Sequence, residues 1–307
     1  MTYIVTGATG FIGKALVDYL LMSNHEVYAV SRSEERVRLL WPECCKLHAI
    51  GCEMSDYKDL PKLVAQADVF VHLAWEGTGH GGRDDVEVQQ QNIECTRLAM
   101  LAAHRMGCKL FVMAGSQAEY GSTKEPQNEA MTCQPFSEYG KAKLRVREMG
   151  FDLAEQLGMK YMHLRIFSLY GENDHAWTLV MSCVDKMLRN EPIDLSPCTQ
   201  NWNFLYVKDA ARQIKQLCKH VIQEDGFVHE VYNIASNDTR PLRDFVERMK
   251  ELTSTKSDLH YGAVIPTHVV SLQPKMSKTI SVVGKLSEYD FDTVIQRIMN
   301  KHNDKTI

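Results

Sequence analysis

The sequence predicts an α/β protein with a doubly wound parallel sheet and a smaller, interleaved C-terminal lobe. Over residues 1–165, short apolar runs typical of buried strands alternate with longer stretches whose apolar residues recur at helical spacing. This alternation predicts parallel strands joined by right-handed helical crossovers that cover both faces of the sheet. A glycine-rich turn follows the first apolar run, as it does at the start of many such sheets.

Six apolar runs give the expected strands of this first part. They span residues 3–5, 27–30, 47–50, 69–73, 110–113 and 161–164. Helices are expected between them at residues 13–22, 86–106 and 140–157. The last two stop directly before Gly107 and Gly158, and glycine often follows a helix because it adopts the left-handed backbone conformation.

The regular rhythm ends after about residue 170. A helix is expected at residues 179–189, strands at 204–207 and 231–234, and helices at 242–252 and 291–299. We therefore expect residues 1–165, with contributions from about 203–235, to form the sheet domain. Residues 166–307 are expected to form the smaller lobe, interleaved with that domain.

Composition excludes several classes of function. The chain has 307 residues and a formal net charge of −4, so it lacks the strong basic field that attracts nucleic acids or anionic membranes. No apolar run approaches the roughly 20 residues needed to cross a bilayer. The nine cysteines include no CxxC pair, and the twelve histidines show no ligand spacing such as HxxxH. We therefore expect a cytoplasmic protein with reduced thiols and without a metal site, a nucleic-acid partner or a membrane partner.

The glycine-rich turn has the spacing of a dinucleotide site. Gly7, Gly10 and Gly13 follow the first strand and open the first helix. Glycine lets the chain turn sharply, lets the backbone approach a phosphate and lets the helix pack closely on the strand. Free N–H groups at the helix start then face the pyrophosphate. The pattern predicts a Rossmann-type domain that binds a nicotinamide dinucleotide.

The end of the second strand bears on which dinucleotide is bound. NAD requires an acidic residue there for the ribose hydroxyls, but the chain has Ser31 and Arg32. A hydroxyl and a guanidinium suit a 2′-phosphate, so NADP(H) is favoured and NAD(H) remains the alternative. Arg36 and Arg38 lie close by in sequence and offer the same chemistry, whereas Arg32 as a solvated surface residue is the simpler interpretation.

A second constellation predicts proton transfer. Tyr139 and Lys143 lie four residues apart on an expected helix and so share a face. An ammonium near a phenol favours the phenolate, which lowers the tyrosine pKa and makes the phenol a usable acid or base. Ser116 ends the fifth strand, where its hydroxyl can hydrogen-bond a substrate oxygen. All three positions are expected at the carboxyl edge of the sheet.

These segments resemble the extended short-chain dehydrogenase/reductase family, specifically its nucleotide-sugar epimerases, dehydratases and ketoreductases. The resemblance covers nearly the whole chain. It rests on the motifs TGATGFIG at residues 6–13, HLA at 72–74, SQAEYG at 116–121, YGKAK at 139–143, RIFSLYG at 165–171, WNFLYVKD at 202–209 and YNI at 232–234.

The resemblance implies a set of site residues. The implied catalytic residues are Ser116, Tyr139 and Lys143. The implied cofactor-binding residues are Gly7, Thr9, Gly10, Phe11, Ile12, Ser31, Arg32, Glu53, Met54, Leu73, Ala74, Asn92, Tyr139, Lys143 and Ile166. The implied substrate-binding residues are Trp75, Ser116, Gln117, Ser168 and Trp202, and the smaller lobe is expected to hold the substrate.

Some of these implications have simpler alternatives. Asn92 can equally be a helix residue bonded to local backbone. Many relatives form homodimers through the helices expected at residues 86–106 and 140–157, although both helices can simply cover the sheet. Trp202 stands where many relatives place an arginine that contacts the substrate diphosphate, so the nucleotide part of the substrate is left open.

The same comparison narrows the reaction. Dehydratases of the family carry an Asp-Glu pair after the catalytic hydroxyl residue, and Gln117 and Ala118 cannot replace it. We therefore expect NADPH-dependent reduction of the 4-keto group of a nucleotide-linked (6-deoxy)hexos-4-ulose. The alternatives are an NAD-dependent nucleotide-sugar 4-epimerase of the UDP-sugar type and a non-catalytic NADP-binding scaffold protein.

Overall fold

A parallel sheet dominates the computed structural model, which describes residues 1–79 and 81–304. Over these residues the sheet has seven strands in the order β10-β6-β5-β4-β1-β2-β3, and every neighbouring pair is parallel. The strands are β1 (Thr2–Thr6), β2 (Glu26–Ser31), β3 (Leu47–Gly51), β4 (Val69–His72), β5 (Leu110–Ser116), β6 (Lys160–Ile166) and β10 (His229–Ile234). Because β2 and β4 lie on opposite sides of β1, the chain changes direction there, and a ligand crevice is expected at that point.

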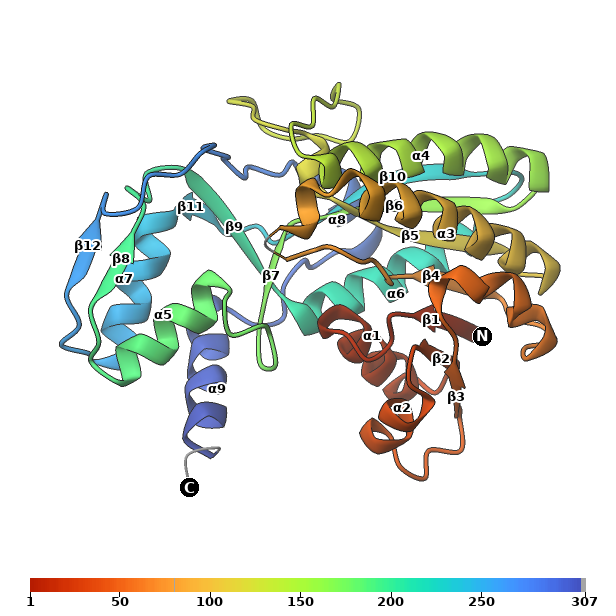
Figure 1. Cartoon of the computed structure of the whole chain (residues 1–307), viewed down its shortest axis with the longest axis horizontal. Coiled ribbons are helices and arrows are strands. Elements are labelled where there is room, and N and C mark those ends of the chain that lie inside the picture. Colours follow the sequence, from red (N-terminus) through yellow and green to blue (C-terminus); the bar gives the residue numbers. More distant parts are fainter. Residues whose placement is uncertain (80, 305–307) are drawn as a thin grey trace.

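Helices cover both faces of this sheet (Figure 1). On one face lie α3 (Val86–Arg105), α4 (Glu138–Leu157) and the 3-10 helix η1 (Met54–Lys62). On the other face α1 (Phe11–Met22) packs beside α6 (Val207–Gln223), and α8 (Ser277–Val283) contacts α6 and β10. The short α2 (Glu34–Leu40) packs beside β2 and β3. Each face has its own apolar core, so the sheet is buried on both sides, as a parallel sheet requires.

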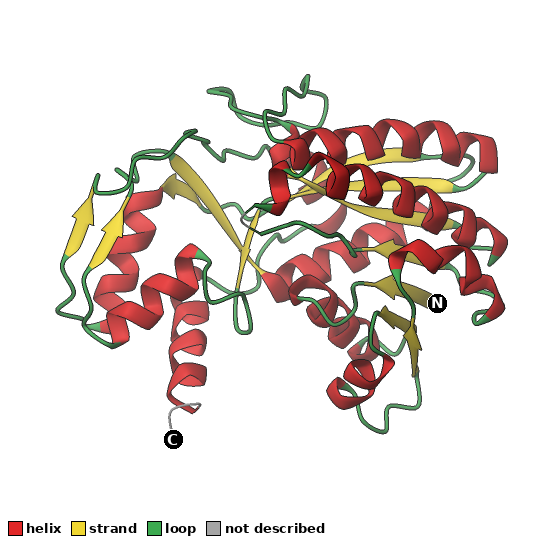
Figure 2. Ribbon diagram, viewed as in Figure 1, coloured by secondary structure: helices red, strands yellow, loops and turns green. Residues whose placement is uncertain are grey.

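The later part of the chain builds a smaller lobe (Figure 2). Its three-stranded sheet contains β7 (Ser168–Tyr170), β9 (Asn201–Tyr206) and β11 (Thr239–Pro241), and a parallel pair contains β8 (Ile193–Leu195) and β12 (Leu259–Tyr261). Helices α5 (Leu179–Leu188), α7 (Leu242–Thr253) and α9 (Phe291–Asp304) pack around a third apolar core.

The two parts share the chain between them. After β9 in the lobe, α6 returns to the large sheet and β10 completes its edge beside β6. The strand expected at residues 204–207 ends at Tyr206, because Val207 already begins α6. Helix α6 is not among the helices expected from the sequence, although its buried Ala210, Ile214, Leu217 and Val221 recur at helical spacing. Among the described residues, no helix is both long enough and apolar enough to span a bilayer.

The position of α4 on the sheet depends on one small residue. Gly150 lies in the middle of α4 over the ring of Tyr161 on β6. A Cβ atom at Gly150 would lie 2.6 Å from the Tyr161 hydroxyl and closer still to its ring. Glycine therefore lets α4, which carries Tyr139 and Lys143, approach β6 closely.

We expect the substitution Gly150→Ala to destabilise the protein despite the better helix propensity of alanine. Forcing a methyl group into packed space costs about 1–3 kcal/mol, whereas alanine gains only about 1 kcal/mol over glycine within a helix. Urea denaturation should give a lower free energy of unfolding than for the wild-type protein. The exposed substitution Glu155→Ala on the same helix is the control and should leave that energy nearly unchanged. An unfolding curve for Gly150→Ala that overlays the wild-type curve would contradict this packing.

Candidate active site

The glycine turn after β1 brings backbone segments into unusually close contact. Gly7 has a φ angle of +66°, and a Cβ atom there would lie 2.8 Å from the backbone nitrogen of Ala74 after β4. A Cβ atom on Gly13 would overlap the carbonyl oxygen of Gly7. Helix α1 begins after Gly10, and no side chain caps its first N–H groups. These groups are therefore available to a phosphate.

A cavity of about 530 Å³ lies against this turn. Of the predicted cofactor residues, its walls include Gly7, Thr9, Gly10, Phe11, Ile12, Ser31, Arg32, Met54, Leu73 and Ala74. Cys52, Tyr57 and Arg36 also contribute. An uncapped helix start, a cradle that side chains would fill and a basic rim together fit a dinucleotide.

The basic residues near the end of β2 differ in their partners. Arg32 is exposed, and its guanidinium lies 3.6 Å from the Glu76 carboxylate. Arg38 binds Glu34 on its own helix at 2.6 Å. The Arg36 side chain has no ion pair within the described part of the chain, and it borders both this cavity and a neighbouring one.

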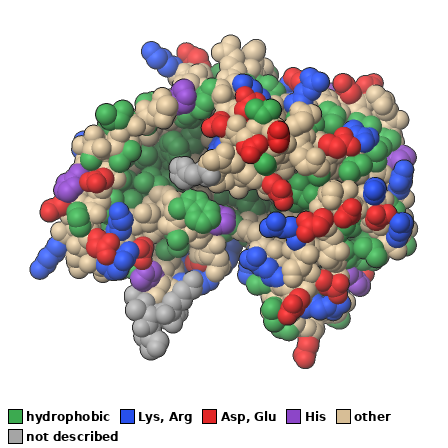
Figure 3. Space-filling view, in the orientation of Figure 1, with side chains coloured by type: hydrophobic (Ala, Val, Ile, Leu, Met, Phe, Trp, Pro, Cys, Tyr) green, Lys and Arg blue, Asp and Glu red, His purple; other side chains and the backbone are tan. Residues whose placement is uncertain are grey.

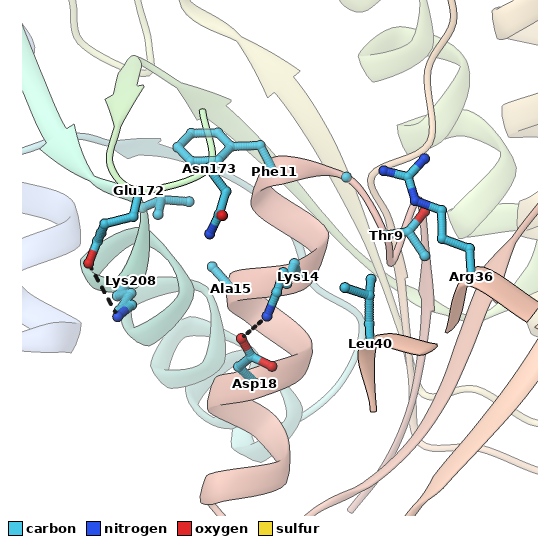
Figure 4. Close-up of a pocket in the computed structure, with 12 residues that line it drawn as sticks. Thr9, Phe11, Lys14, Ala15, Asp18, Arg36, Leu40, Glu172, Asn173 and Lys208 are labelled. Carbon is cyan, nitrogen blue, oxygen red and sulfur yellow. Dashed lines mark hydrogen bonds and ion pairs between the residues drawn. The ribbon is translucent and has the colours of Figure 1, made fainter. Parts of the chain in front are cut away.

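The neighbouring cavity has about 240 Å³ and lies between α1, α2 and the start of α6 (Figure 4). Lys14 pairs with Asp18 there at 2.8 Å, and Lys208 pairs with Glu172 at 3.7 Å. The lysine charges are therefore balanced locally, whereas Arg36 is not.

A second cavity of about 310 Å³ continues from the dinucleotide cavity past Phe11, Ile12, Leu73 and Trp75. It brings together the three predicted catalytic residues and several other predicted site residues, namely Ser116, Tyr139, Lys143, Gln117, Ile166 and Ser168. Figure 3 shows that the molecule is hollowed where the lobe meets the sheet domain. Within the residues that the structure describes, no group of His, Cys, Asp and Glu side chains could hold a metal ion.

Ser116 is held in place by a buried carboxylate. The residue ends β5 and precedes the short 3-10 helix η3 (Gln117–Glu119). Its backbone N–H donates to Glu119 Oε1 at 2.8 Å, and its hydroxyl oxygen accepts the Ala118 N–H at 3.1 Å. This bond uses a lone pair of Oγ and leaves the hydroxyl proton for a partner in the cavity, which is the Tyr139 oxygen here and would be a substrate oxygen in a complex.

Glu119 is itself fully buried and multiply bonded. Its carboxylate lies 2.8 Å from His163 Nε2 and accepts the Arg165 Nε–H at 3.0 Å. Burial alone would raise the pKa of Glu119, but these two partners hold it at about 2, so the carboxyl group is ionised at neutral pH. Gly115 has no side chain at a point where a Cβ atom would overlap the His163 ring.

Lys143 lies in an apolar setting. Its Nζ donates to the carbonyl oxygen of Ala114 at 2.7 Å and lies 3.4 Å from the centre of the Trp75 ring. Burial lowers the pKa of Lys143 well below its usual value. The same Nζ is 5.6 Å from the centre of the Tyr139 ring.

The pKa of Tyr139 departs from expectation. Burial raises it, while Arg83 and a hydrogen bond with Ser116 lower it. The pKa of Tyr139 therefore lies above its ordinary value, and not below it as the sequence predicts. The Lys143 ammonium faces Trp75 and Ala114, and the guanidinium carbon of Arg83 lies only 4.3 Å from the Tyr139 ring centre.

Three predicted site residues line neither the dinucleotide cavity nor the catalytic cavity. Glu53 is exposed at the start of η1. Asn92 binds the backbone of Glu76, accepting its N–H at 2.9 Å and donating to its carbonyl at 3.0 Å. Trp202 packs among the apolar residues of the lobe, beside Phe204.

Two residues of this region were not predicted from the sequence. Gln89 lies one turn before Asn92 on α3 and accepts the Trp75 Nε1–H at 2.9 Å. It also donates to the carbonyls of Gly77 and Gly82. Arg83 belongs to the short 3-10 helix η2 (Gly82–Asp84) in the loop that these bonds hold. A pair of amides three residues apart on one helix is a readable signal for Gln89 and Asn92, but a single arginine in a glycine-rich loop gives none.

Comparisons with known proteins identify the family of this chain. A family model described as "NAD dependent epimerase/dehydratase family" matches residues 3–235. The chain is 26% identical to dTDP-6-deoxy-L-talose 4-dehydrogenase (NAD(+)) of Aggregatibacter actinomycetemcomitans, over 80% of this chain and 88% of that protein. It is 23% identical to CDP-abequose synthase of Yersinia pseudotuberculosis, over 94% and 98% of the two chains.

Solved structures agree in fold. The structure of UDP-glucose 4-epimerase from Thermotoga maritima with UDP-glucose superposes with a TM-score of 0.87 at 19% identity and covers both chains completely. MoeE5 in complex with UDP-glucose and NAD gives a TM-score of 0.85 at 22% identity, again over both whole chains. The expected fold class and the family resemblance are confirmed: this chain belongs to the NAD dependent epimerase/dehydratase family of extended short-chain dehydrogenases/reductases.

Proposed function

We propose that this nucleotide-sugar-modifying enzyme reduces the 4-keto group of a nucleotide-linked 6-deoxyhexos-4-ulose with NADPH. The observation that carries the proposal is the convergence of Ser116, Tyr139 and Lys143 in one cavity that continues into the dinucleotide cavity. A carbonyl placed there would meet a hydroxyl, a phenol and an ammonium. The name of one relative, dTDP-6-deoxy-L-talose 4-dehydrogenase, supports carbon 4 as the reacting position.

Each of the three side chains has a defined part in this mechanism. A bound nicotinamide supplies the hydride that the reduction requires. Ser116 donates its hydroxyl proton as a hydrogen bond to the carbonyl oxygen, which polarises the carbonyl. Tyr139 transfers its phenolic proton to the same oxygen as negative charge develops on it. By the family resemblance, Lys143 holds the cofactor ribose, and both Lys143 and Tyr139 lie on the nicotinamide side of the cofactor.

The neighbours of Ser116 support a reduction over a dehydration. Gln117 borders the catalytic cavity, and its neutral amide cannot act as an acid or a base at neutral pH. Ala118 contributes its backbone N–H to Ser116 and has no reactive group. Loss of water from the sugar would need an acid and a base at these positions.

The residues around the dinucleotide cavity support NADPH as the cofactor. The residue directly after β2 is Arg32 and not a carboxylate, and Ser31, Arg32 and Arg36 line the cavity. The Ser31 hydroxyl lies 3.0 Å from that of Thr9, so a polar pocket already exists at this corner. The alternative is NAD, which is named with the dTDP-6-deoxy-L-talose dehydrogenase and bound in the MoeE5 structure.

A nucleotide-sugar 4-epimerase is the second candidate function, because UDP-sugar 4-epimerases are among the proteins of the same fold. An epimerase returns the hydride to the sugar and consumes no nucleotide. Incubation with UDP-glucose and catalytic NAD, followed by NMR of the sugar, distinguishes the two: UDP-galactose indicates an epimerase. Stoichiometric loss of NADPH with a 4-keto sugar indicates a reductase and also excludes the non-catalytic scaffold.

Assembly and location follow the same reasoning. We propose a cytoplasmic homodimer that pairs through α3 and α4, as many relatives do. The nine cysteines form no disulfide in the structure, which supports a reducing compartment.

We expect Tyr139→Phe to lower kcat for reduction of dTDP-4-dehydro-6-deoxyglucose, or of its CDP, UDP or GDP counterpart, by about 100- to 10,000-fold. The reason is that general acid catalysis contributes this factor, and phenylalanine keeps the ring but removes the proton. Loss of NADPH absorbance measures the rate. Tyr19→Phe on α1 is the control and should retain activity. Full turnover by Tyr139→Phe would remove Tyr139 as the proton donor.

We expect Arg32→Asp to weaken NADPH binding by about tenfold, since a hydrogen bond to a charged group contributes about 1.5–3 kcal/mol. NADH binding should weaken less or improve, because the new carboxylate can accept ribose hydroxyls. Cofactor fluorescence gives both dissociation constants without a substrate. Arg38→Asp is the matched control, because it makes the same change of charge at a residue that binds Glu34 and does not line the dinucleotide cavity. Equal constants for NADPH and NADH in the wild-type protein would contradict the proposed preference.

A further inference from the structure

The loop after β4 carries a cation that the catalytic motifs do not include. Arg83 lines the catalytic cavity, and its guanidinium carbon lies 4.3 Å from the centre of the Tyr139 ring. Within the described residues, the Arg83 side chain has no hydrogen bond and no carboxylate partner. Its charge is therefore directed at the phenol.

The backbone that carries Arg83 is fixed from both sides. Gln89 Nε2 donates to the Gly82 carbonyl at 2.8 Å and to the Gly77 carbonyl at 3.3 Å. A Cβ atom on Gly77 would lie 2.7 Å from the Gly82 oxygen, so the two ends of the loop touch. The Asp85 side chain, directly after η2, caps α3 by accepting the Val88 N–H at 3.1 Å.

Lys143 lies farther from the Tyr139 ring than Arg83 does. It lies 5.6 Å from the Tyr139 ring centre but 3.4 Å from that of Trp75, and its Nζ donates to the Ala114 carbonyl. Trp75 is itself held by Gln89 and meets Tyr139 edge-on, with ring centres 6.1 Å apart. The Lys143 side chain therefore lies closer to the ring of Trp75 than to that of Tyr139.

From this geometry we propose that Arg83 is the electrostatic partner of Tyr139, tuning proton transfer by holding a positive charge against the face of the phenol. The inference deepens the proposed function and rests on it for the identity of the reaction. In the step itself, the phenolic O–H bond breaks and the proton forms a new O–H bond with the substrate oxygen. Arg83 stabilises the negative charge that remains on the phenolate.

Several other charged and titratable groups also lie around Tyr139. Ser116 offers a hydrogen bond, and Glu119 behind it carries a negative charge that opposes the phenolate, although Arg165 counters that charge. Asp174, from the connection after β7, lines the same cavity. Among the described residues, Arg83 and Lys143 are the cations that contact the ring, and Arg83 is the nearer of the two.

Removing the positive charge of Arg83 should therefore make the phenol harder to ionise. Arg83→Met keeps an unbranched side chain over the ring without the charge, and Arg83→Lys keeps the charge. We expect the ionisation midpoint of Tyr139 to move to higher pH in Arg83→Met and to stay near the wild-type value in Arg83→Lys.

The midpoint can be measured without a substrate. The full chain is labelled with 3-fluorotyrosine, and its fluorine NMR spectrum is followed with pH. The signal that disappears in Tyr139→Phe is that of Tyr139. Fluorination alters the phenol equally in every variant, so midpoints are compared only between labelled proteins. Arg105→Met removes an exposed charge at the far end of α3 and is the control.

The outcomes separate this inference from the proposed function. A midpoint in Arg83→Met that matches wild type, or that shifts no more than in Arg105→Met, overturns the role of Arg83 even if the protein reduces a 4-keto sugar. A clear upward shift supports the role even if no tested 4-keto sugar is reduced.

Kinetics give a second readout where a 4-keto sugar is reduced. Reduction needs the protonated phenol, so the fall of kcat at alkaline pH should begin at higher pH in Arg83→Met than in wild type. If instead KM rises and the pH profile of kcat stays in place, Arg83 binds the substrate and the electrostatic role is wrong.

Discussion

A single buried carboxylate ties the catalytic edge of the sheet together. Glu119 accepts the N–H of Ser116 and binds His163 and Arg165 on the neighbouring strand β6. Arg165 continues outward to the Glu129 carbonyl and the Cys133 sulfur. Loss of one partner from such a buried ion pair typically costs about 3–5 kcal/mol, because the other charge is then left without compensation. The position of the Ser116 hydroxyl therefore depends on charges that are fully hidden from solvent.

Much of this architecture can be predicted from the sequence, because local patterns of residues specify it. The strands of the large sheet are continuous apolar runs, and Gly7, Gly10 and Gly13 are required by backbone contacts at fixed spacing. Tyr139 and Lys143 share a helix face, and the sheet edge brings Ser116 to them. The strands, the glycine turn and the three catalytic positions could therefore be predicted, because periodicity and strand ends specify them.

The remainder depends on contacts between segments far apart in sequence. Trp202 follows a pattern like that of a substrate residue, yet it packs among apolar residues of the lobe, and Asn92 binds backbone. The spacing of Tyr139 and Lys143 places the two side chains on one helix face but cannot show that Trp75 lies against the ammonium or that Arg83 covers the phenol. The charge environment of a titrating group is set by loops, and loop positions have no periodicity.

The way in which α3 holds the loop after β4 bears on how readily selectivity can diverge. Within the described part of this loop, Asn92 and Gln89 bind backbone atoms of Glu76, Gly77 and Gly82, and Gln89 also holds the side chain of Trp75. Exchange of Thr78, which borders both cavities, would break none of these anchoring bonds. Side chains of this loop that face the cavities can therefore change, in evolution or in a directed library, while the hydrogen bonds that hold the loop to α3 stay the same.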